Sequence, residues 1–169
     1  MRQTVGTVGV LDLETIALKI EKSTCLIGLN RPESLNAINE QMCHDLTKAM
    51  NWAAEASDIR VVLIYGVGSC FSTGGDLTVD IPSLTEDTLE KIFKPMLLSI
   101  FYCPKVVISR VHGFAIGIGS AIAMSSDLFF MADDAYIAQP HVGIGLIPDG
   151  GVSWHLLHQL GGKRAFEMI

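Results

Sequence analysis

Charged residues make up only 18% of the 169-residue sequence, and its lysines and arginines form no cluster. The formal net charge is −6. A nucleic-acid-binding protein needs grouped Lys and Arg side chains to displace counterions from phosphates, so this composition argues against nucleic acid as the main partner. No apolar run reaches the length of a membrane span, because Lys, Arg, Asp or Gly interrupts each candidate. We therefore expect a globular protein that binds neither nucleic acid nor membrane.

Cysteine is also scarce, and no two cysteines form a CxxC pair. Such spacing indicates neither a zinc site nor a disulfide framework. The N-terminus, MRQTVGTVGV, has neither the apolar core of a signal peptide nor the Arg-rich, amphipathic character of a transit peptide. We expect a cytoplasmic protein without bound metal, with reduced and buried thiols at Cys25, Cys43, Cys70 and Cys103.

Hydrophobic residues account for 49% of the sequence, which at this length is enough to form the core of one domain. Residues 14–30 contain two short β-branched runs around a polar Lys22-Ser23 turn, which predicts a hairpin. After Asn39, a typical N-cap residue, apolar residues follow helical spacing and predict a helix over 40–56.

Two continuous apolar runs bounded by glycine, 59–68 and 105–113, predict strands that are buried on both faces. Between them, residues 87–102 have a helical pattern that Pro95 interrupts. Beyond the second strand the pattern predicts a helix over 119–127, followed by strands over 128–132 and 134–140. A last helix is predicted over 161–169.

Three of the apolar strands run into glycine-containing loops, each followed by a predicted helix: VVLIYGVGSCFSTGGDL, VVISRVHGFAIGIGSAIA and AYIAQPHVGIGLIPDGGVSWHLL. This arrangement favours an anion or a developing oxyanion, because it leaves backbone N–H groups unpaired. The nucleotide motifs fail, since GIGSAI has Ile122 where a Rossmann loop has its third glycine and no Walker A sequence exists. No GxSxG surrounds any serine. We interpret His155 and His158 as residues of a half-exposed helix face rather than metal ligands.

Four segments occur in an order and spacing that resemble the enoyl-CoA hydratase/isomerase family, also called crotonases: LNRPESLNAINEQM, FSTGGDL, VHGFAIGIGSAIAMSSDL and AQPHVGIGLIPDGGVSWHLLHQLGGKRAFEM. The resemblance covers residues 14–169. It implies an α/β crotonase-like fold, a spiral of ββα turns with outer helices, preceded by an extension over 1–13. Family members carry further helices, so we expect the chain to lack the C-terminal helical part, and to form a trimer or dimer of trimers when that part is present.

The resemblance also implies the chemistry. Such enzymes act on acyl-CoA thioesters, with coenzyme A as part of the substrate and no separate cofactor. Moving a proton along the acyl chain puts negative charge on the thioester oxygen, and two backbone N–H groups in a dry pocket stabilise the enolate. The matching donors are Gly75, in STGGD, and Ile118, in AIGIG, where the family usually has glycine.

The catalytic carboxylates depart from the hydratase pattern. The family's two glutamate positions hold Ala121 and His141, so hydration by a glutamate pair is not expected. In family members that shift a double bond, a carboxylate at the position of Asp149 moves the proton. We therefore predict an isomerase that converts 3-enoyl-CoA to 2-enoyl-CoA, with Asp149 as the proton carrier and His141 lining the pocket or orienting the substrate. A turn-forming aspartate in PDGG is the other interpretation of Asp149.

Substrate contacts are predicted from the same motifs. The loop of Asn36, Ala37 and Ile38 resembles the segment that holds the adenine end of CoA, and Arg31 or Lys105 could meet a phosphate or be a plain surface charge. Two further functions stay open: hydration or another CoA-thioester reaction that uses His141, and acyl-CoA binding without chemistry. The remaining candidate binding residues are Ser72, Gly74, Asp76, Leu77, Pro140 and Gly145.

Overall fold

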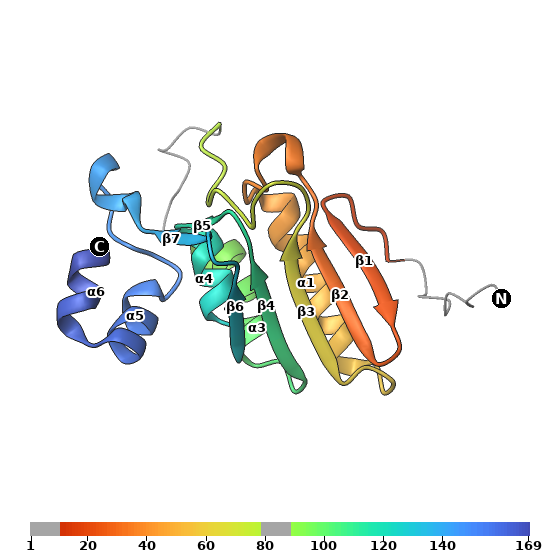
Figure 1. Cartoon of the computed structure of the whole chain (residues 1–169). Helices are drawn as coiled ribbons and strands as arrows, with labels where there is room; N and C mark the ends of the chain where they lie inside the picture. The colour runs from red at the N-terminus through yellow and green to blue at the C-terminus, as the bar shows by residue number, and fades with distance from the viewer. Residues whose placement is uncertain (1–10, 79–88) are drawn as a thin grey trace.

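The computed structural model describes residues 11–78 and 89–169 (Figure 1). The predicted hairpin is confirmed: β1 (Ile16–Glu21) pairs antiparallel with β2 (Thr24–Leu29). The turn between them places Lys22 at a φ of 57°. The predicted extension over 1–13 lies almost wholly outside the described residues.

A five-stranded sheet forms the centre of the fold, in the order β1-β2-β3-β4-β6. From β2 onward, neighbouring strands of this sheet are parallel: β3 (Val61–Gly66), β4 (Val106–Val111) and β6 (Leu128–Met131). All three lie within the predicted runs: the glycine-bounded apolar pattern located β3 and β4, and the short apolar run over 128–132 located β6.

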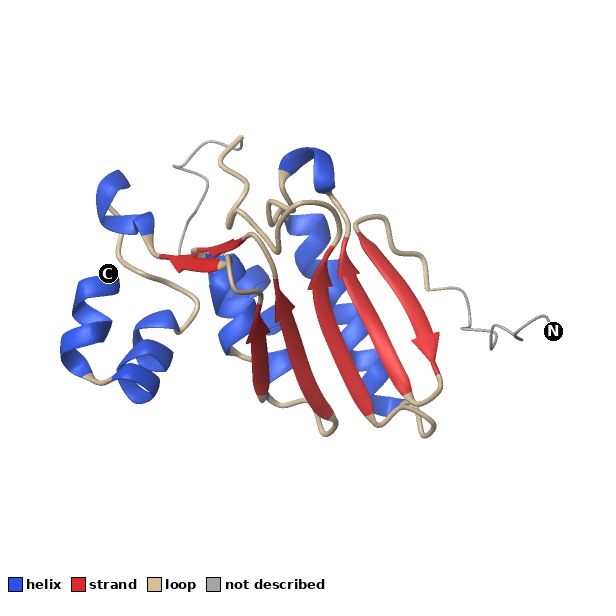
Figure 2. Cartoon of the chain, in the orientation of Figure 1, coloured by secondary structure: helices blue, strands red, loops and turns tan. Residues whose placement is uncertain are grey.

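Helices cover one face of this sheet, as Figure 2 shows for α1 (Glu40–Glu55), α3 (Lys94–Phe101) and α4 (Ile118–Met124). The start of α1 is as predicted, because the backbone N–H of Met42 donates to Oδ1 of Asn39 (2.9 Å). Burial on both faces is wrong for β3 and β4, however. Residues alternate between buried and partly exposed along both strands, and Val106 is 48% exposed, since the helices pack on one side only.

Pro95 does not end the helical stretch. A π-helical turn, Leu89–Phe93, runs directly into α3, and Pro95 is the second residue of α3. Proline is tolerated in the first turn of an α-helix, because the N–H it lacks would have no intrahelical acceptor there. The predicted interruption is seen only as a change from π-helix to α-helix next to Pro95. Residues 87 and 88 of the predicted helix lie outside the described residues.

A second, two-stranded parallel sheet continues the spiral. It pairs β5 (Phe114–Ile116), which the sequence did not predict, with β7 (Tyr136–Ala138). The chain then forms a 3₁₀ turn (Pro140–Ile144), α5 (Val152–Leu160) and α6 (Gly162–Met168). The successions β1-β2-α1, β4-β5-α4 and β6-β7-α5 confirm the predicted α/β class and its ββα repeat.

Within the described ranges, the structure contains no helix that combines the length and the hydrophobicity needed to cross a lipid bilayer.

Candidate active site

The predicted site residues come from loops at one edge of the sheet. The loops after β2, β3 and β4 follow the carboxyl ends of parallel strands of the five-stranded sheet. Such ends meet at the same edge, where open α/β sheets place their ligands. Ile118 and the segment with His141 and Asp149 follow the parallel strands β5 and β7 of the second sheet. A bridge between Ala115 and Ser72 joins β5 to the loop after β3. The topology therefore gathers four segments that are far apart in sequence.

The segments that carry Gly75 and Ile118 lie side by side. The backbone N–H of Ser72 donates to the carbonyl of Phe114 (3.1 Å), and that of Ile116 donates to the carbonyl of Ser72 (3.0 Å). Gly119 allows this approach, because a Cβ there would lie 2.7 Å from Cβ and Oγ of Ser72. The two candidate oxyanion donors follow closely: Gly75 lies three residues after Ser72, and Ile118 lies two residues after Ile116.

The N–H groups of Gly75 and Ile118 have no acceptor among the described residues, although their neighbours do. Ile38 donates to the carbonyl of Gly74 (2.8 Å), and Asp76 donates to the carbonyl of Ile38 (3.0 Å), so the edge of Gly75 that carries its own N–H stays unused. A Cβ at Gly75 would meet no atom within 4 Å. Two unpaired donors on adjacent segments are what an oxyanion hole requires.

The structure brings His141 and Asp149 together. Nε2 of His141 lies 3.5 Å from Oδ1 of Asp149, which follows it eight positions later in the sequence. The His141 ring is also near Gly117, since a Cβ at Gly117 would lie 3.6 Å from its Cε1 and Nε2. His141 therefore lies beside the residue that precedes Ile118, with Asp149 on its Nε2 side.

The two side chains of this pair differ in exposure. The His141 side chain is 9% exposed and that of Asp149 is 34% exposed. Oδ1 of Asp149 and Nδ1 of His141 are buried without a hydrogen-bond partner in the described part of the chain. Because Oδ1 is buried, the exposed oxygen of Asp149 is Oδ2. Of the two, Asp149 is the group that a ligand can reach.

Ala121 and Gly150 fit closely against each other. A Cβ at Gly150 would lie 2.8 Å from Cβ of Ala121 and 2.6 Å from Cδ1 of Ile118. Ala121 is fully buried, and Gly150 packs against its Cβ. The Ile118 side chain points toward Gly150, which leaves its backbone N–H on another side of the residue.

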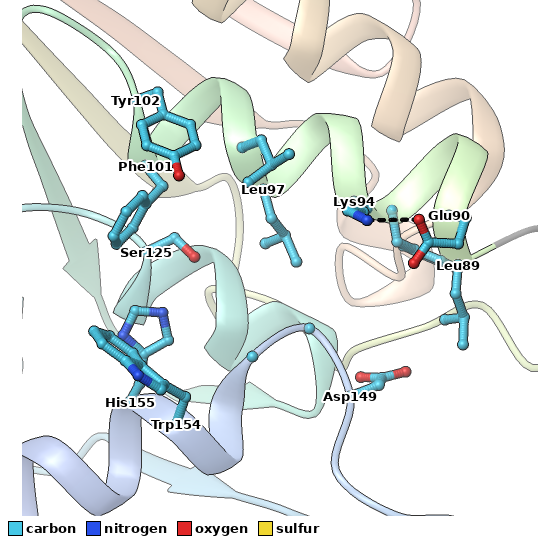
Figure 3. Close-up of a pocket in the computed structure, with 14 residues that line it drawn as sticks. Leu89, Glu90, Lys94, Leu97, Phe101, Tyr102, Ser125, Asp149, Trp154 and His155 are labelled. Carbon is cyan, nitrogen blue, oxygen red and sulfur yellow. Dashed lines mark hydrogen bonds and ion pairs between the residues drawn. The ribbon is translucent and has the colours of Figure 1, made fainter. Parts of the chain in front are cut away.

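An apolar cavity of about 400 Å³ extends from Asp149 between α3 and α5. Figure 3 shows Asp149 and Leu89 near one end, and Phe101, Trp154 and His155 at the other. The expectation of a half-exposed helix face is wrong for His155, which is only 7% exposed and lines this cavity. Its burial, with a smaller contribution from the nearby His158, lowers the pKa of His155.

Asn36 and Ser72 hold the loops of the site to one another. Oδ1 of Asn36 accepts from the N–H of Arg31 (2.9 Å), and its Nδ2 donates to the carbonyls of Val67 (2.9 Å) and Cys70 (3.0 Å). Oγ of Ser72 donates to the carbonyl of Asn36 (2.8 Å) and accepts from the N–H of Gly74 (3.1 Å). These side chains are used internally, so contacts to a ligand from here would come from the backbone.

Arg31 is committed to neighbours in the same loops. Its Nη1 donates to Oδ2 of Asp76 (2.8 Å) and to the carbonyl of Ala37 (2.6 Å). Hydrogen bonds from Thr78 and, to a smaller extent, from Arg31 lower the pKa of Asp76 against the opposing effect of burial. Lys105 donates to the carbonyl of Ala56 (3.2 Å) and precedes β4, at the opposite edge of the sheet. The idea that Lys105 meets a phosphate in this site is therefore not supported.

The other predicted binding residues line the same edge. Leu77 is 57% exposed next to Asp76. Pro140 begins the 3₁₀ turn and Gly145 ends it with a φ of 75°. Gly74 has a φ of 95°, and a Cβ there would lie 2.7 Å from the carbonyl oxygen of Ile116, so only glycine fits between the two segments.

Sequence reasoning missed the cavity wall and one buried polar pair. Leu97 and Phe101 belong to a stretch in which no motif was recognised, and only the helical periodicity hinted at an inward face. Gln139 and Ser120, whose side chains hydrogen-bond (2.6 Å), lie within the recognised segments, but no local pattern indicates that they meet. Among the described residues, no group of three or more His, Cys, Asp or Glu side chains could hold a metal ion.

Comparison with known proteins gives consistent similarities. A family model described as enoyl-CoA hydratase/isomerase matches residues 19–169. The chain is 34% identical over 160 residues to a "Probable enoyl-CoA hydratase" of Rhodobacter capsulatus, covering 94% of this chain and 62% of the relative. It is 33% identical over 162 residues to the 1,2-epoxyphenylacetyl-CoA isomerase of Escherichia coli, covering 92% and 62%.

A solved structure, an enoyl-CoA hydratase of a Polaromonas species, superposes with a TM-score of 0.84 at 31% identity, over 91% of this chain and 62% of that one. The chain therefore spans about 62% of the length of these relatives.

Proposed function

The chain belongs to the enoyl-CoA hydratase/isomerase family, and on this basis we propose that it acts on an acyl-CoA thioester and shifts a double bond from the 3-enoyl to the 2-enoyl position. One observation carries the choice of isomerisation: Asp149 lines the apolar cavity with His141 behind it, while α4 offers only Ala121 at the first hydratase glutamate position. A single carboxylate is enough for a proton shuttle, whereas hydration by the family pattern needs two.

The proposed reaction uses groups of this chain in two strokes. The Asp149 carboxylate removes a proton from C2 of the 3-enoyl thioester, and the electron pair delocalises onto the thioester oxygen. The N–H groups of Gly75 and Ile118 stabilise the resulting dienolate. The protonated Asp149 then returns the proton to C4, so that the double bond forms between C2 and C3 and the carboxylate is regenerated.

His141 and the cavity have supporting roles in this proposal. His141 is largely buried with Nε2 3.5 Å from Oδ1 of Asp149, so in this proposal it packs behind the carboxylate and limits the positions that the carboxylate can take. The apolar space between α3 and α5 suits an acyl chain, whose burial is favourable by about 25 cal/mol per Å² of apolar surface. Asn36 and Ala37 would contribute backbone contacts to the CoA moiety.

The test is incubation with a 3-enoyl-CoA in deuterated water, followed by NMR of product and label. We expect conjugated 2-enoyl-CoA, with deuterium at C4 in the molecules for which the protonated Asp149 exchanges with solvent before it returns its proton. Asp149→Asn should lower the rate at least about 100-fold, because it removes the general base, with thioester affinity nearly unchanged. Asp134→Asn, an exposed aspartate in the turn before β7, is the matched control. A fully active Asp149→Asn protein would refute the assignment.

A second candidate is hydration or another CoA-thioester reaction that uses His141. The observation in its favour is Nδ1 of His141, a buried imidazole nitrogen without a partner among the described residues. Formation of 3-hydroxyacyl-CoA from 2-enoyl-CoA, lost in His141→Gln and kept in Asp149→Asn, would support it. Thioester binding with neither exchange nor hydration would instead indicate an acyl-CoA-binding protein.

A further inference from the structure

We infer that Ser120 and Gln139 are positioning residues that orient and strengthen the N–H of Ile118 as an oxyanion donor. The inference rests on the function proposed above for that N–H. Neither side chain lines the cavity described above or is expected to contact the substrate. Both are buried, with Gln139 6% exposed and Ser120 fully enclosed.

The two side chains form a relay that ends on the backbone. Nε2 of Gln139 donates to Oγ of Ser120 (2.6 Å), and Oγ of Ser120 donates to the carbonyl of Gly117 (2.6 Å). The backbone N–H groups of Ser120 (2.9 Å) and Ala121 (3.2 Å) donate to the same carbonyl. The pairing of β5 with β7 places Gln139 for this role, because Gln139 directly follows β7 and Gly117 directly follows β5.

The carbonyl of Gly117 and the N–H of Ile118 belong to one peptide unit. The unit is planar and trans, so the two groups point in opposite directions, and fixing one fixes the other. A hydrogen bond to the carbonyl also polarises the amide, which makes its N–H a better donor. The relay therefore acts on the side of the peptide that faces away from the ligand.

The hydrogen-bond chemistry permits one direction only. The Gly117 carbonyl is an acceptor, so the single hydroxyl proton of Ser120 is used there. Gln139 must then present its NH₂ group to Ser120, which turns Oε1 away. Oε1 is buried without a partner in the described part of the chain. Leaving this oxygen unpaired costs stability. The cost is consistent with a role for Gln139 that depends on the hydrogen bond from its NH₂ group to Ser120.

The backbone at Gly117 needs such support. Its φ of 51° and ψ of −125° lie in a region that only glycine adopts readily, and ψ of Gly117 sets the direction of the following peptide. The N–H of Gly117 is held by the carbonyl of Ala138 (3.0 Å) on one side. The Ser120 hydroxyl holds the next peptide on the other side, so both peptides that flank a flexible residue are fixed.

The test compares Ser120→Ala and Gln139→Glu with Ser109→Ala. Glutamate has nearly the same size as glutamine, but its carboxylate only accepts hydrogen bonds. In Gln139→Glu the Ser120 hydroxyl therefore donates to the carboxylate instead of to the carbonyl of Gly117. Ser109 is a matched control because it is also fully buried and its hydroxyl is also hydrogen-bonded, to the hydroxyl of Ser126 (2.7 Å). This hydrogen bond does not involve the Gly117–Ile118 peptide. Readouts are kcat and KM for 3-enoyl-CoA isomerisation, and the NMR shifts of the Gly117 carbonyl carbon and the Ile118 amide.

We expect both relay variants to lower kcat about tenfold with little change in KM, because the oxyanion forms only after the substrate has bound. The double variant should be no slower than Ser120→Ala, since either change breaks the same relay. Ser109→Ala should retain wild-type kcat and both shifts. Relay variants with wild-type kcat, or independent effects that multiply in the double variant, would overturn the inference.

The NMR shifts separate this inference from the proposed function. If the wild-type protein shows no isomerisation and no C2 exchange, the proposed function fails. The Gly117 and Ile118 shifts then still report the relay: movement in both relay variants but not in Ser109→Ala supports the positioning of the peptide. Unmoved shifts contradict the relay whatever the activity.

Discussion

His141 and His155 are equally buried, and their surroundings give them different chemistry. Each is 7% exposed. His141 faces the Asp149 carboxylate, whereas the ring of His155 lies among aromatic side chains, with centroids 6.3 Å from Phe101 and 5.0 Å from Trp154. A carboxylate can orient and stabilise an imidazole that handles protons, and an apolar wall favours a neutral one. Residue type alone therefore does not assign a role to either histidine.

The lowered pKa of His155 predicts acid sensitivity. The unfolded chain binds a proton at this histidine at a higher pH than the folded chain does, so the free energy of unfolding should fall as pH drops below about 6.5. His155→Leu should flatten this part of the pH profile, as measured by urea denaturation. Equal slopes in wild type and His155→Leu would contradict the prediction.

Close approach between elements, rather than any one element, builds the candidate oxyanion hole. Helix α4 lies against the segment that contains Ser72 because Gly119 has no side chain, and the loop before α5 lies against α4 because Gly150 has none. At both contacts the absence of a glycine side chain lets the backbones of the two segments come close together. The geometry of the two N–H donors thus depends on glycines that take no part in the reaction.

Gly119→Ala tests this dependence. The added Cβ would lie 2.7 Å from Ser72, and we expect a loss of about 1–3 kcal/mol in the free energy of unfolding, from overpacking, despite the better helix propensity of alanine. The proposed isomerase activity should fall as the two segments separate. Gly143→Ala is the control, because a Cβ there would meet no atom within 4 Å. A Gly119→Ala protein as stable and active as Gly143→Ala would show that this contact is not critical.

One core unites the molecule, from β1 to α6. The buried apolar cluster includes Ile16 near the start of the described chain and Ala165 near its end, with Cys25 of β2 and Cys43 of α1 inside it. Small domains with one core usually unfold cooperatively. The boundary at residue 13, the cytoplasmic location and the trimer stay predictions.

Thiol labelling tests this cooperativity. Burial raises the pKa of Cys25 and of Cys43 to about 12, so at pH 8 only about one thiol in ten thousand is a reactive thiolate. Cys103 is partly exposed and should be labelled first. Cys25 and Cys43 should then react at one shared rate, that of global unfolding, in a mass-spectrometric time course. Markedly different rates for Cys25 and Cys43 would indicate that the sheet and α1 open separately.

Local pattern was sufficient for most of the elements and for the family, although β5 was missed. The hairpin, the start of α1 at Asn39 and the parallel strands follow from turn, capping and periodicity signals within a few residues of each element. The four ordered motifs were sufficient to predict the ββα fold. Helix coverage of one sheet face, by contrast, was not predictable from β3 and β4, because an apolar run looks the same whether one or both faces are covered.

The sequence by itself thus determined most of the strands and helices, though not β5, and the loops that carry the candidate chemistry, since those signals are short-range. Only the tertiary structure decided that Asp149 faces the cavity with His141 behind it, that Arg31 is tied to Asp76, and that Gln139 reaches Ser120. Such pairings depend on strand register and on glycine-permitted close approach between distant segments. No single stretch of sequence encodes these contacts, because each is set by two elements packed together.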